Sequence, residues 1–215
     1  MTPGFCSIAV MPIAALFLLA ACTTMSREDC RTVDWLAVGE SDGAAGRPAA
    51  ERLSAHTRSC ERAGIVPDHT RWRAGYDKGL PRYCTPMNGF EVGNRGSVYH
   101  DVCPSNLADG FLRARQLGAA IRDQRRAVVE LDAQIREMGE ELRQLRHQDE
   151  ASAQNAEGDG LDARVRLHEL EQDRWQLQMK KGEAEHRLKR SERAARIIVA
   201  TLQPAFGAIS ETVAN

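Results

Sequence analysis

Histidine and cysteine are the residues of this sequence that are best suited to metal binding or nucleophilic chemistry, and two of them have a ligand-like spacing. His56 and Cys60 lie four residues apart, which would place both side chains on one face of a helix. No two cysteines have the Cys-x-x-Cys spacing of a zinc ribbon. We therefore interpret the pair as a surface histidine beside a disulfide-bonded cysteine, and we expect no metal site.

Three side chains remain as candidates for acid–base catalysis, namely Asp42, His56 and His100. The spacing of these residues gives no reason to pair them, and the sequence has no His-Glu-x-x-His motif and no free thiol beside a histidine. A histidine without a partner is usually a surface residue. The sequence therefore predicts a non-enzymatic protein without a cofactor, and a hydrolase of envelope polymers is a less favoured alternative.

Residues 1–21 contain no charged side chain, and their apolar stretch from Ile8 to Ala21 is shorter than the roughly 20 residues that span a bilayer. A stretch of this length is typical of a signal peptide. It ends in Leu19-Ala20-Ala21-Cys22, which resembles the lipobox of bacterial lipoproteins. The resemblance implies that Cys22 becomes a lipidated N-terminus, followed by a linker over residues 22–29.

The leader departs from the usual pattern because it has no Lys or Arg before its apolar stretch. A start codon further upstream, an ordinary cleaved secretory peptide and a short uncleaved anchor therefore stay open as alternatives. Thr23, rather than Asp, follows Cys22, which in Gram-negative lipoproteins implies passage to the outer membrane. We expect a protein that is anchored in this membrane by its acyl chains and faces the periplasm.

Residues 30–104 form a first region that is rich in Gly, Cys and aromatic residues. The pattern predicts three helices, over residues 32–46, 49–63 and about 68–83. Pro48 breaks the chain between the first two helices, and Gly64 ends the second. Asp68 is the expected N-cap of the third helix.

The first and third of these helices each carry an aromatic residue followed by two glycines four residues apart. The glycines are Gly39 and Gly43 in the first helix and Gly75 and Gly79 in the third. Glycine inside a helix costs about 1 kcal/mol relative to alanine, so the bare backbone needs a reason. We expect it to let the two helices pack closely, and a backbone-lined ligand groove is the alternative.

Four cysteines remain for disulfides once Cys6 leaves with the leader and Cys22 is lipidated, namely Cys30, Cys60, Cys84 and Cys103. Two disulfides with three connectivities are open to them. Antiparallel packing of the first two helices would place Cys30 near Cys60, which leaves Cys84 to pair with Cys103. A region this small needs such cross-links because its core is small.

The segment between the last two of these cysteines is rich in residues that we interpret as turn residues: Pro86, Asn88-Gly89, Gly93, Asn94 and Gly96. Phe90–Val92 and Ser97–Tyr99 alternate in polarity, which predicts a short β-hairpin across residues 93–96.

A set of Gly, Cys, Asp and aromatic residues follows a distinctive order through this region: Cys30, Asp34-Trp35, Gly39, Asp42-Gly43, Gly46, Cys60, Pro67-Asp68, Gly75, Gly79-Leu80, Tyr83-Cys84, Asn88-Gly89, Gly93, Gly96, Tyr99 and Cys103-Pro104. This order and spacing resemble the DUF2799 family of proteobacterial lipoproteins. The resemblance covers about a third of the chain. The family has no established activity, so the resemblance implies an envelope location and supplies no catalytic residue.

Residues 105–215 form a second region that is rich in Arg, Glu, Gln, Leu and Ala. Apolar residues recur every three or four positions and form a first seam, which has one polar member, Gln124. The seam consists of Ile121, Gln124, Val128, Leu131, Ile135, Met138, Leu142 and Leu145. A second seam is less regular: Leu167, Leu170, Arg174, Leu177, Lys181, Ala184, Leu188, Ser191, Ala195, Ile198 and Leu202.

The two seams predict an antiparallel coiled-coil hairpin with arms of about 35–40 residues, which is about 50–60 Å at 1.5 Å per residue. We expect its turn within residues 151–160, and we expect Pro204 to end the second helix before a C-terminal tail. Self-association through the polar second seam is an alternative to closure within one chain.

Charge is balanced in the whole chain, with 29 Lys and Arg against 30 Asp and Glu. It is also balanced between Arg27 and Asp101, which contain eleven of each sign. A nucleic-acid partner is therefore not expected, because such binders usually carry a basic excess. The sequence predicts a mainly α-helical envelope lipoprotein with a structural or protein-interaction role. Its expected partners are the membrane and an envelope protein or second copy, and a module that binds a small ligand or envelope polymer is the alternative.

Overall fold

The computed structural model of the chain describes residues 25–154 and 161–213, and of residues 152–154, 161 and 204–213 it describes the backbone alone. The predicted signal peptide over residues 1–21 and the predicted lipidation site Cys22 lie outside the described residues. Residues 155–160 of the predicted turn also lie outside the described residues, whereas residues 151–154 belong to the end of a helix. Within the described ranges there is no strand, and no helix is both long and apolar enough to cross a membrane.

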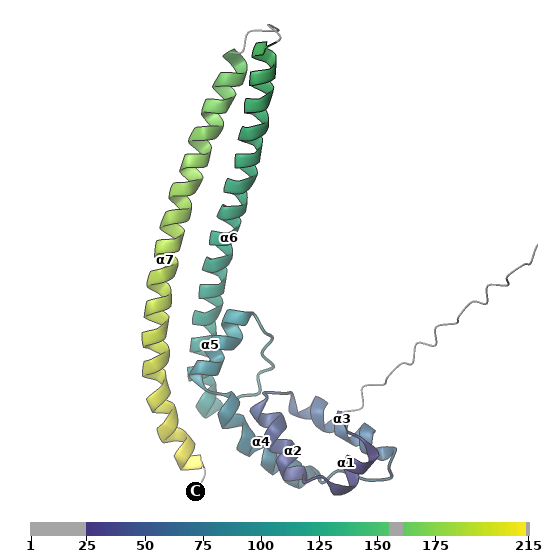
Figure 1. Ribbon diagram of the computed structural model, residues 1–215. Coiled ribbons are helices and arrows are strands. Elements are labelled where there is room, and N and C mark those ends of the chain that lie inside the picture. Colours follow the sequence, from purple (N-terminus) through teal and green to yellow (C-terminus); the bar gives the residue numbers. More distant parts are fainter. Residues whose placement is uncertain (1–24, 155–160, 214–215) are drawn as a thin grey trace, which may run out of the picture.

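The described residues form seven helices that build a base and an arm (Figure 1). The helices are α1 (Arg27–Thr32), α2 (Trp35–Ala44), α3 (Ala49–Glu61), α4 (His69–Tyr83), α5 (Pro86–Arg95), α6 (Ser105–Gln154) and α7 (Leu161–Val213). We call residues 25–120 the base and residues 121–213 the arm. The long helix α6 belongs to both.

Polar side chains fix where most of the base helices begin. Asp34 accepts a hydrogen bond from the backbone N–H of Leu36 and caps α2, so the helix predicted over residues 32–46 begins at Trp35, and a separate short helix, α1, precedes it. Asp68 caps α4 as predicted, through the N–H of Arg71.

Helices α2 and α4 pack with their backbones almost in contact at the predicted glycines. A methyl group on Gly39 would lie 1.9 Å from the carbonyl oxygen of Trp72. The other three glycines meet the opposing backbone in the same way: Gly43, Gly75 and Gly79. Helix backbone thus fills the glycine face, and the ligand groove considered as an alternative is not formed there.

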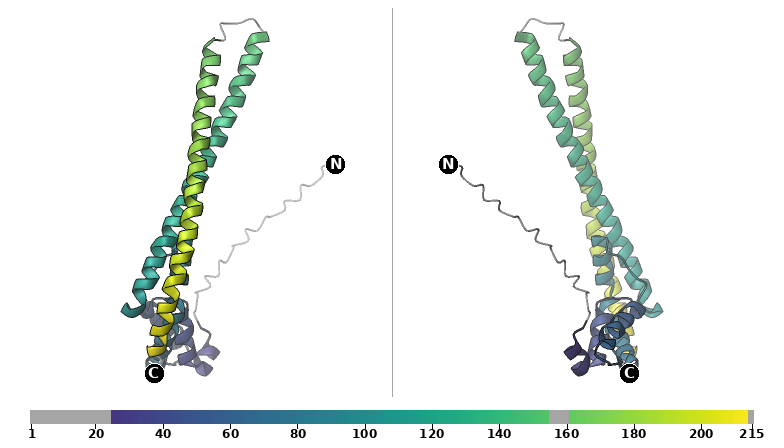
Figure 2. Two further views of the ribbon diagram at one scale, coloured as in Figure 1. Left: turned by 90° about the vertical axis from the view of Figure 1, so that its left-hand side faces the viewer. Right: turned by 90° about the vertical axis from the view of Figure 1, so that its right-hand side faces the viewer.

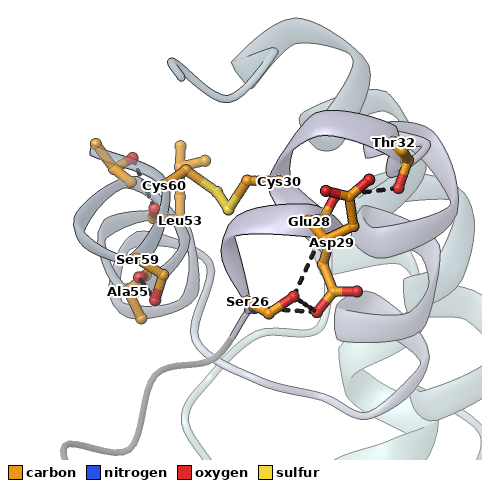
Figure 3. Close-up of a disulfide and its surroundings, with 10 residues drawn as sticks. Ser26, Glu28, Asp29, Cys30, Thr32, Leu53, Ala55, Ser59 and Cys60 are labelled. Carbon is orange, nitrogen blue, oxygen red and sulfur yellow. Dashed lines mark hydrogen bonds between the residues drawn. A yellow bond between two sulfur atoms is a disulfide. The ribbon is translucent and has the colours of Figure 1, made fainter. Parts of the chain in front are cut away.

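Two disulfides close the base with the pairing expected from antiparallel helices. Cys30–Cys60 connects α1 to the end of α3 (Figure 3), and Cys84–Cys103 connects the end of α4 to the segment before α6. Cys60 and Cys84 are fully buried and join a core that contains Trp35, Trp72, Tyr76, Leu80 and Leu107.

Residues 86–95 form helix α5, so the β-hairpin predicted across residues 93–96 is wrong. Helix signals at both ends outweigh the alternation in polarity. Thr85 accepts a hydrogen bond from the N–H of Asn88, and Pro86 occupies the first turn, where its missing N–H does no harm. Gly96 ends the helix in the left-handed region, with a φ of 72°.

The glycines of α5 pack against α6 in the same manner as α2 packs against α4. A methyl group on Gly93 would lie 2.0 Å from the carbonyl oxygen of Arg115, and one on Gly118 would lie 2.1 Å from that of Phe90. Gly89 in the preceding turn also contacts the α6 backbone. Gly89 and Gly93, which were interpreted from the sequence as turn residues, are therefore helix-packing residues.

Helices α6 and α7 lie side by side along the arm and cross at a shallow angle (Figure 2). The least exposed α6 residues follow the predicted seam, with Ile121 and Leu142 buried. The 50 residues of α6 correspond to about 75 Å at 1.5 Å per residue. This length exceeds the prediction because the helix starts inside the base, at Ser105.

Helix α7 departs from the prediction near its C-terminal end. Val199 is 2% exposed and takes the place of Ile198, which is 41% exposed. The seam continues from Ala195 to Val199, four residues later, and not to Ile198, three residues later. Val199 thereby lines the groove that α7 forms with α5 and α6. The helix also continues through Pro204 to Val213, so the prediction that Pro204 ends it is wrong. Proline removes one backbone hydrogen bond but does not interrupt this helix.

Candidate functional site

A buried carboxylate, Asp42, connects three helices of the base. Its side chain is on α2, and the residue is 4% exposed. Asp42 Oδ1 accepts a hydrogen bond from Arg52 Nε at 2.8 Å. Its Oδ2 accepts from His56 Nε2 at 2.7 Å and from Trp72 Nε1 at 3.2 Å. We call these four residues the Asp42 cluster.

The local sequence explains how the three donors reach one carboxylate. Arg52 and His56 lie one helical turn apart on α3 and therefore share a face. Cys60 lies one turn further on that face, and its disulfide to Cys30 holds the end of α3 in place. Trp72 comes from α4, which can approach because the glycines of α2 and α4 lack side chains.

The environment of Asp42 keeps its carboxylate ionised. Burial alone would raise the pKa of Asp42, but hydrogen bonds from His56, Arg52 and Trp72, with the positive charge of Arg52, outweigh burial and lower the pKa below its ordinary value. The ionised carboxylate can only accept hydrogen bonds, and three donors occupy its two oxygens. The cluster is therefore built to hold α2, α3 and α4 together.

The structure brings two of the three acid–base candidates together. The expectation that nothing pairs them is wrong, because Asp42 and His56 form a buried pair. His56 is 2% exposed, so the interpretation of it as a surface histidine is also wrong, and the Trp35 ring lies edge-on to it at 6.0 Å. The third candidate, His100, is exposed in the loop after α5. The pairing depends on how α2 and α3 pack, which residue spacing along one helix does not define.

The interpretation that the sequence lacks the Gly-x-Ser-x-Gly motif of serine hydrolases is also wrong, because Gly39-Glu40-Ser41-Asp42-Gly43 fits this pattern. In those enzymes the serine sits at a sharp turn between a strand and a helix. Here all five residues lie within α2, and both glycines pack against α4. The exposed Ser41 and the Asp42–His56 pair nevertheless line one cavity of about 430 Å³.

Metal binding finds no support in the described part of the chain. Within it, no group of three or more His, Cys, Asp or Glu side chains could hold a metal ion. The ligand-like spacing of His56 and Cys60 has a structural explanation, because Cys60 is bonded to Cys30 and His56 to Asp42.

Residues 34–120 match the model of the DUF2799 family, which is described as a protein of unknown function. The match begins at the N-cap of α2 and ends just after Gly118, the α6 glycine that contacts α5. The arm lies outside the match. No curated protein and no solved structure matches the chain.

Proposed function

We propose that this DUF2799 protein is a non-enzymatic lipoprotein of the bacterial outer membrane, which presents a stiff helical arm to an envelope protein or to a second copy. In this proposal Cys22 carries the lipid anchor, and the base connects the anchor to the arm. The observation that carries the proposal is the continuity of α6, a 50-residue helix that is common to base and arm.

The first turns of α6 are part of the base. Leu107 and Phe111 are 2% and 0% exposed, and Phe111 contacts the rings of Tyr83 and Tyr99. Further along the same helix, Ile121 and Leu142 are buried in the arm. Because no break in the helix separates these contacts, the fold provides no hinge between base and arm.

The surface of the arm supports a role in contacts. Trp175 and Met179 lie one turn apart on α7 and are 61% and 52% exposed. Large apolar side chains that are adjacent and exposed are typical of interaction surfaces. We therefore place the contact surface for the partner around these two residues.

The two disulfides support the proposed compartment. Disulfides form and persist in oxidising environments such as the bacterial periplasm and are rare in the cytosol. Cys30–Cys60 connects α1 to the end of α3, and Cys84–Cys103 connects the end of α4 to the segment before α6, both at the core of the base.

Photo-crosslinking in the native envelope tests the proposed contact. A photoreactive amino acid at position 175 or 179 of the full chain should give a discrete adduct, with either another protein or a second copy. The same amino acid at Arg113, whose side chain is 66% exposed on the base part of α6, is the matched control. Adducts at position 113 without any at 175 or 179 would contradict a contact through the arm.

Metabolic labelling with palmitate tests the anchor separately. The wild-type chain should incorporate the label and fractionate with the outer membrane. Cys22→Ala should lose both properties. Label retained in this variant would show that Cys22 is not the lipidated residue.

A hydrolase is a second candidate, because Ser41 and the Asp42–His56 pair line the same cavity. The test is turnover of muropeptides or lipids by the full chain, compared with Ser41→Ala and His56→Ala. Turnover that disappears in both variants, while their folds persist, would favour a hydrolase over the non-enzymatic proposal.

A further inference from the structure

A second cavity, of about 440 Å³, lies between the α2–α3 turn, the first turns of α3 and the loop that follows α5. We propose that this junction cavity binds a small organic anion, a carboxylate or a phosphate monoester, through Arg47 and Arg95. The inference does not depend on the role of the arm, because every residue that lines the cavity belongs to the base.

Positive charge dominates the walls of the junction cavity. Its ionisable residues besides Tyr83 are three arginines, one histidine and one carboxylate: Arg47, Arg52, Arg95, His100 and Glu51. The whole chain has a net charge of -1, so this basic excess is local. The planar guanidinium group matches the paired oxygens of a carboxylate or phosphate, which makes arginine the preferred residue for such ligands.

The three arginines differ in how far their charge is already neutralised. Arg52 belongs to the Asp42 cluster, and its Nε donates to Asp42 at 2.8 Å. Arg95 lies 3.6 Å from Glu91, which is long for a charge-assisted hydrogen bond. The side chain of Arg47 makes no hydrogen bond or ion pair within the described parts of the chain. Only its backbone is engaged, because its N–H donates to the Asp42 carbonyl at 3.2 Å and its carbonyl accepts from the Tyr76 hydroxyl at 2.6 Å. Arg47 is therefore the guanidinium most available to a ligand.

The backbone turn that carries Arg47 is fixed in position. Gly46 has a φ of 64°, and a methyl group there would lie 2.2 Å from the Tyr83 ring. The ring thus covers the turn, and no other residue fits at position 46. The adjacent Pro48 is the N-cap of α3, so the positive end of this helix dipole adds to the potential at the same wall.

The opposite wall, which carries Arg95, also contributes two apolar residues and is held by a disulfide. Val92 is buried, and Val98 is 73% exposed in the loop after α5. Cys103, bonded to Cys84, anchors this loop, and its N–H donates to the Tyr99 hydroxyl at 3.1 Å. The cavity thus combines the Arg47 guanidinium, which has no partner among the described residues, and the loosely paired Arg95 with a small apolar surface. This combination suits an anion attached to a short organic group.

Calorimetric titration of the full chain in detergent tests the proposal with two probes. Glycerol 3-phosphate represents a phosphate monoester, and N-acetylmuramic acid represents a sugar carboxylate. At least one probe should bind saturably and more weakly at high salt. The probe that binds identifies the class of anion, phosphate monoester or carboxylate. Binding of both probes would show that the cavity recognises negative charge without distinguishing the two classes.

Variants locate the site. Arg47→Gln should weaken binding at least tenfold, and Arg95→Gln should also weaken it. Arg113→Gln removes a matched charge from an exposed position outside the cavity and should leave binding unchanged. Because the Arg47 side chain has no partner among the described residues, its variant should melt at the same temperature as the wild type. Absence of saturable binding by both probes, or equal binding by Arg47→Gln and the wild type, would overturn the proposal.

Discussion

Base and arm are both helical, but they hold their helices together in different ways. In the base, pairs of helices touch backbone to backbone at glycines, in α2 against α4 and again in α5 against α6. In the arm, side chains of a heptad seam separate the two backbones. Contacts between backbones cannot relax by side-chain rotation, whereas a seam of side chains can adjust.

The arm tolerates polar side chains at positions of its apolar seam. Its seam includes Lys181, which donates to Asp132 at 2.5 Å, and Arg174. Gln124 Oε1 and Arg174 Nε of the arm are buried without a hydrogen-bond partner in the described residues, as is Arg115 Nε of the base. Such groups destabilise a packed interior, yet the long antiparallel pair accommodates them. The difference predicts that equivalent substitutions have large effects in the base and small effects in the arm.

The largest effect is expected for Gly39→Ala. The new methyl group would lie 1.9 Å from the Trp72 carbonyl oxygen, so α2 and α4 must separate. Separation would also stretch the hydrogen bond from Trp72 to Asp42. We expect a loss of at least about 4 kcal/mol in the free energy of unfolding, measured by urea denaturation. A loss below about 1 kcal/mol would show that the backbones of the base can adjust after all.

The Asp42 cluster gives the next largest effect. Asp42→Ala leaves Arg52, His56 and Trp72 without their shared acceptor, and removing one member of a buried ionic group costs about 3–5 kcal/mol. Asp77→Ala is the matched control, because Asp77 is also a helical aspartate paired with an arginine but its side chain is 53% exposed. Asp77→Ala should lower the free energy of unfolding by no more than about 1 kcal/mol. Equal losses for both variants would mean that the cluster does not organise the base.

The same cluster should make stability depend on pH. The pKa of Asp42 is lowered in the folded protein, so the folded state favours the ionised carboxylate. Its contribution is complete above the pKa of the unfolded chain, near 3.8, and is lost as pH falls through the folded pKa. The free energy of unfolding, measured between pH 7 and pH 2, should therefore fall more steeply with decreasing pH for the wild type than for Asp42→Asn. Parallel curves would contradict this assignment.

Removal of the disulfide Cys30–Cys60 should have an intermediate effect. The bond closes a loop with a sequence separation of 30, and loop-closure entropy for this length corresponds to about 3–4 kcal/mol. Cys30→Ser combined with Cys60→Ser should lower the melting temperature of the base accordingly. The arm should keep its helical circular dichroism at temperatures where the base has melted. One cooperative transition for both parts would show that the arm depends on the base for its stability.

The sequence predicted much of the division into base and arm, because the residue patterns that define the two parts are local in the chain. Heptad spacing identified the arm, and glycine pairs identified the contact of α2 with α4. The β-hairpin prediction failed because Gly89 and Gly93 were interpreted as turn residues, although their four-residue spacing repeats that of Gly39 and Gly43. The Asp42–His56 pair could not be predicted, because it depends on the packing of α2 against α3.

The smallest expected effect has the opposite sign and comes from a glycine of the arm. Gly182 lies within α7, and a methyl group there would meet nothing within 4 Å. Gly182→Ala should therefore stabilise the arm by about 0.5–1 kcal/mol, because alanine has the higher helix propensity and makes no clash. The measurement is the same urea denaturation that is used for Gly39→Ala, so one substitution is compared in two helical settings. Destabilisation by Gly182→Ala would instead indicate that another helix approaches this face of α7, next to Met179, as α4 approaches α2 in the base.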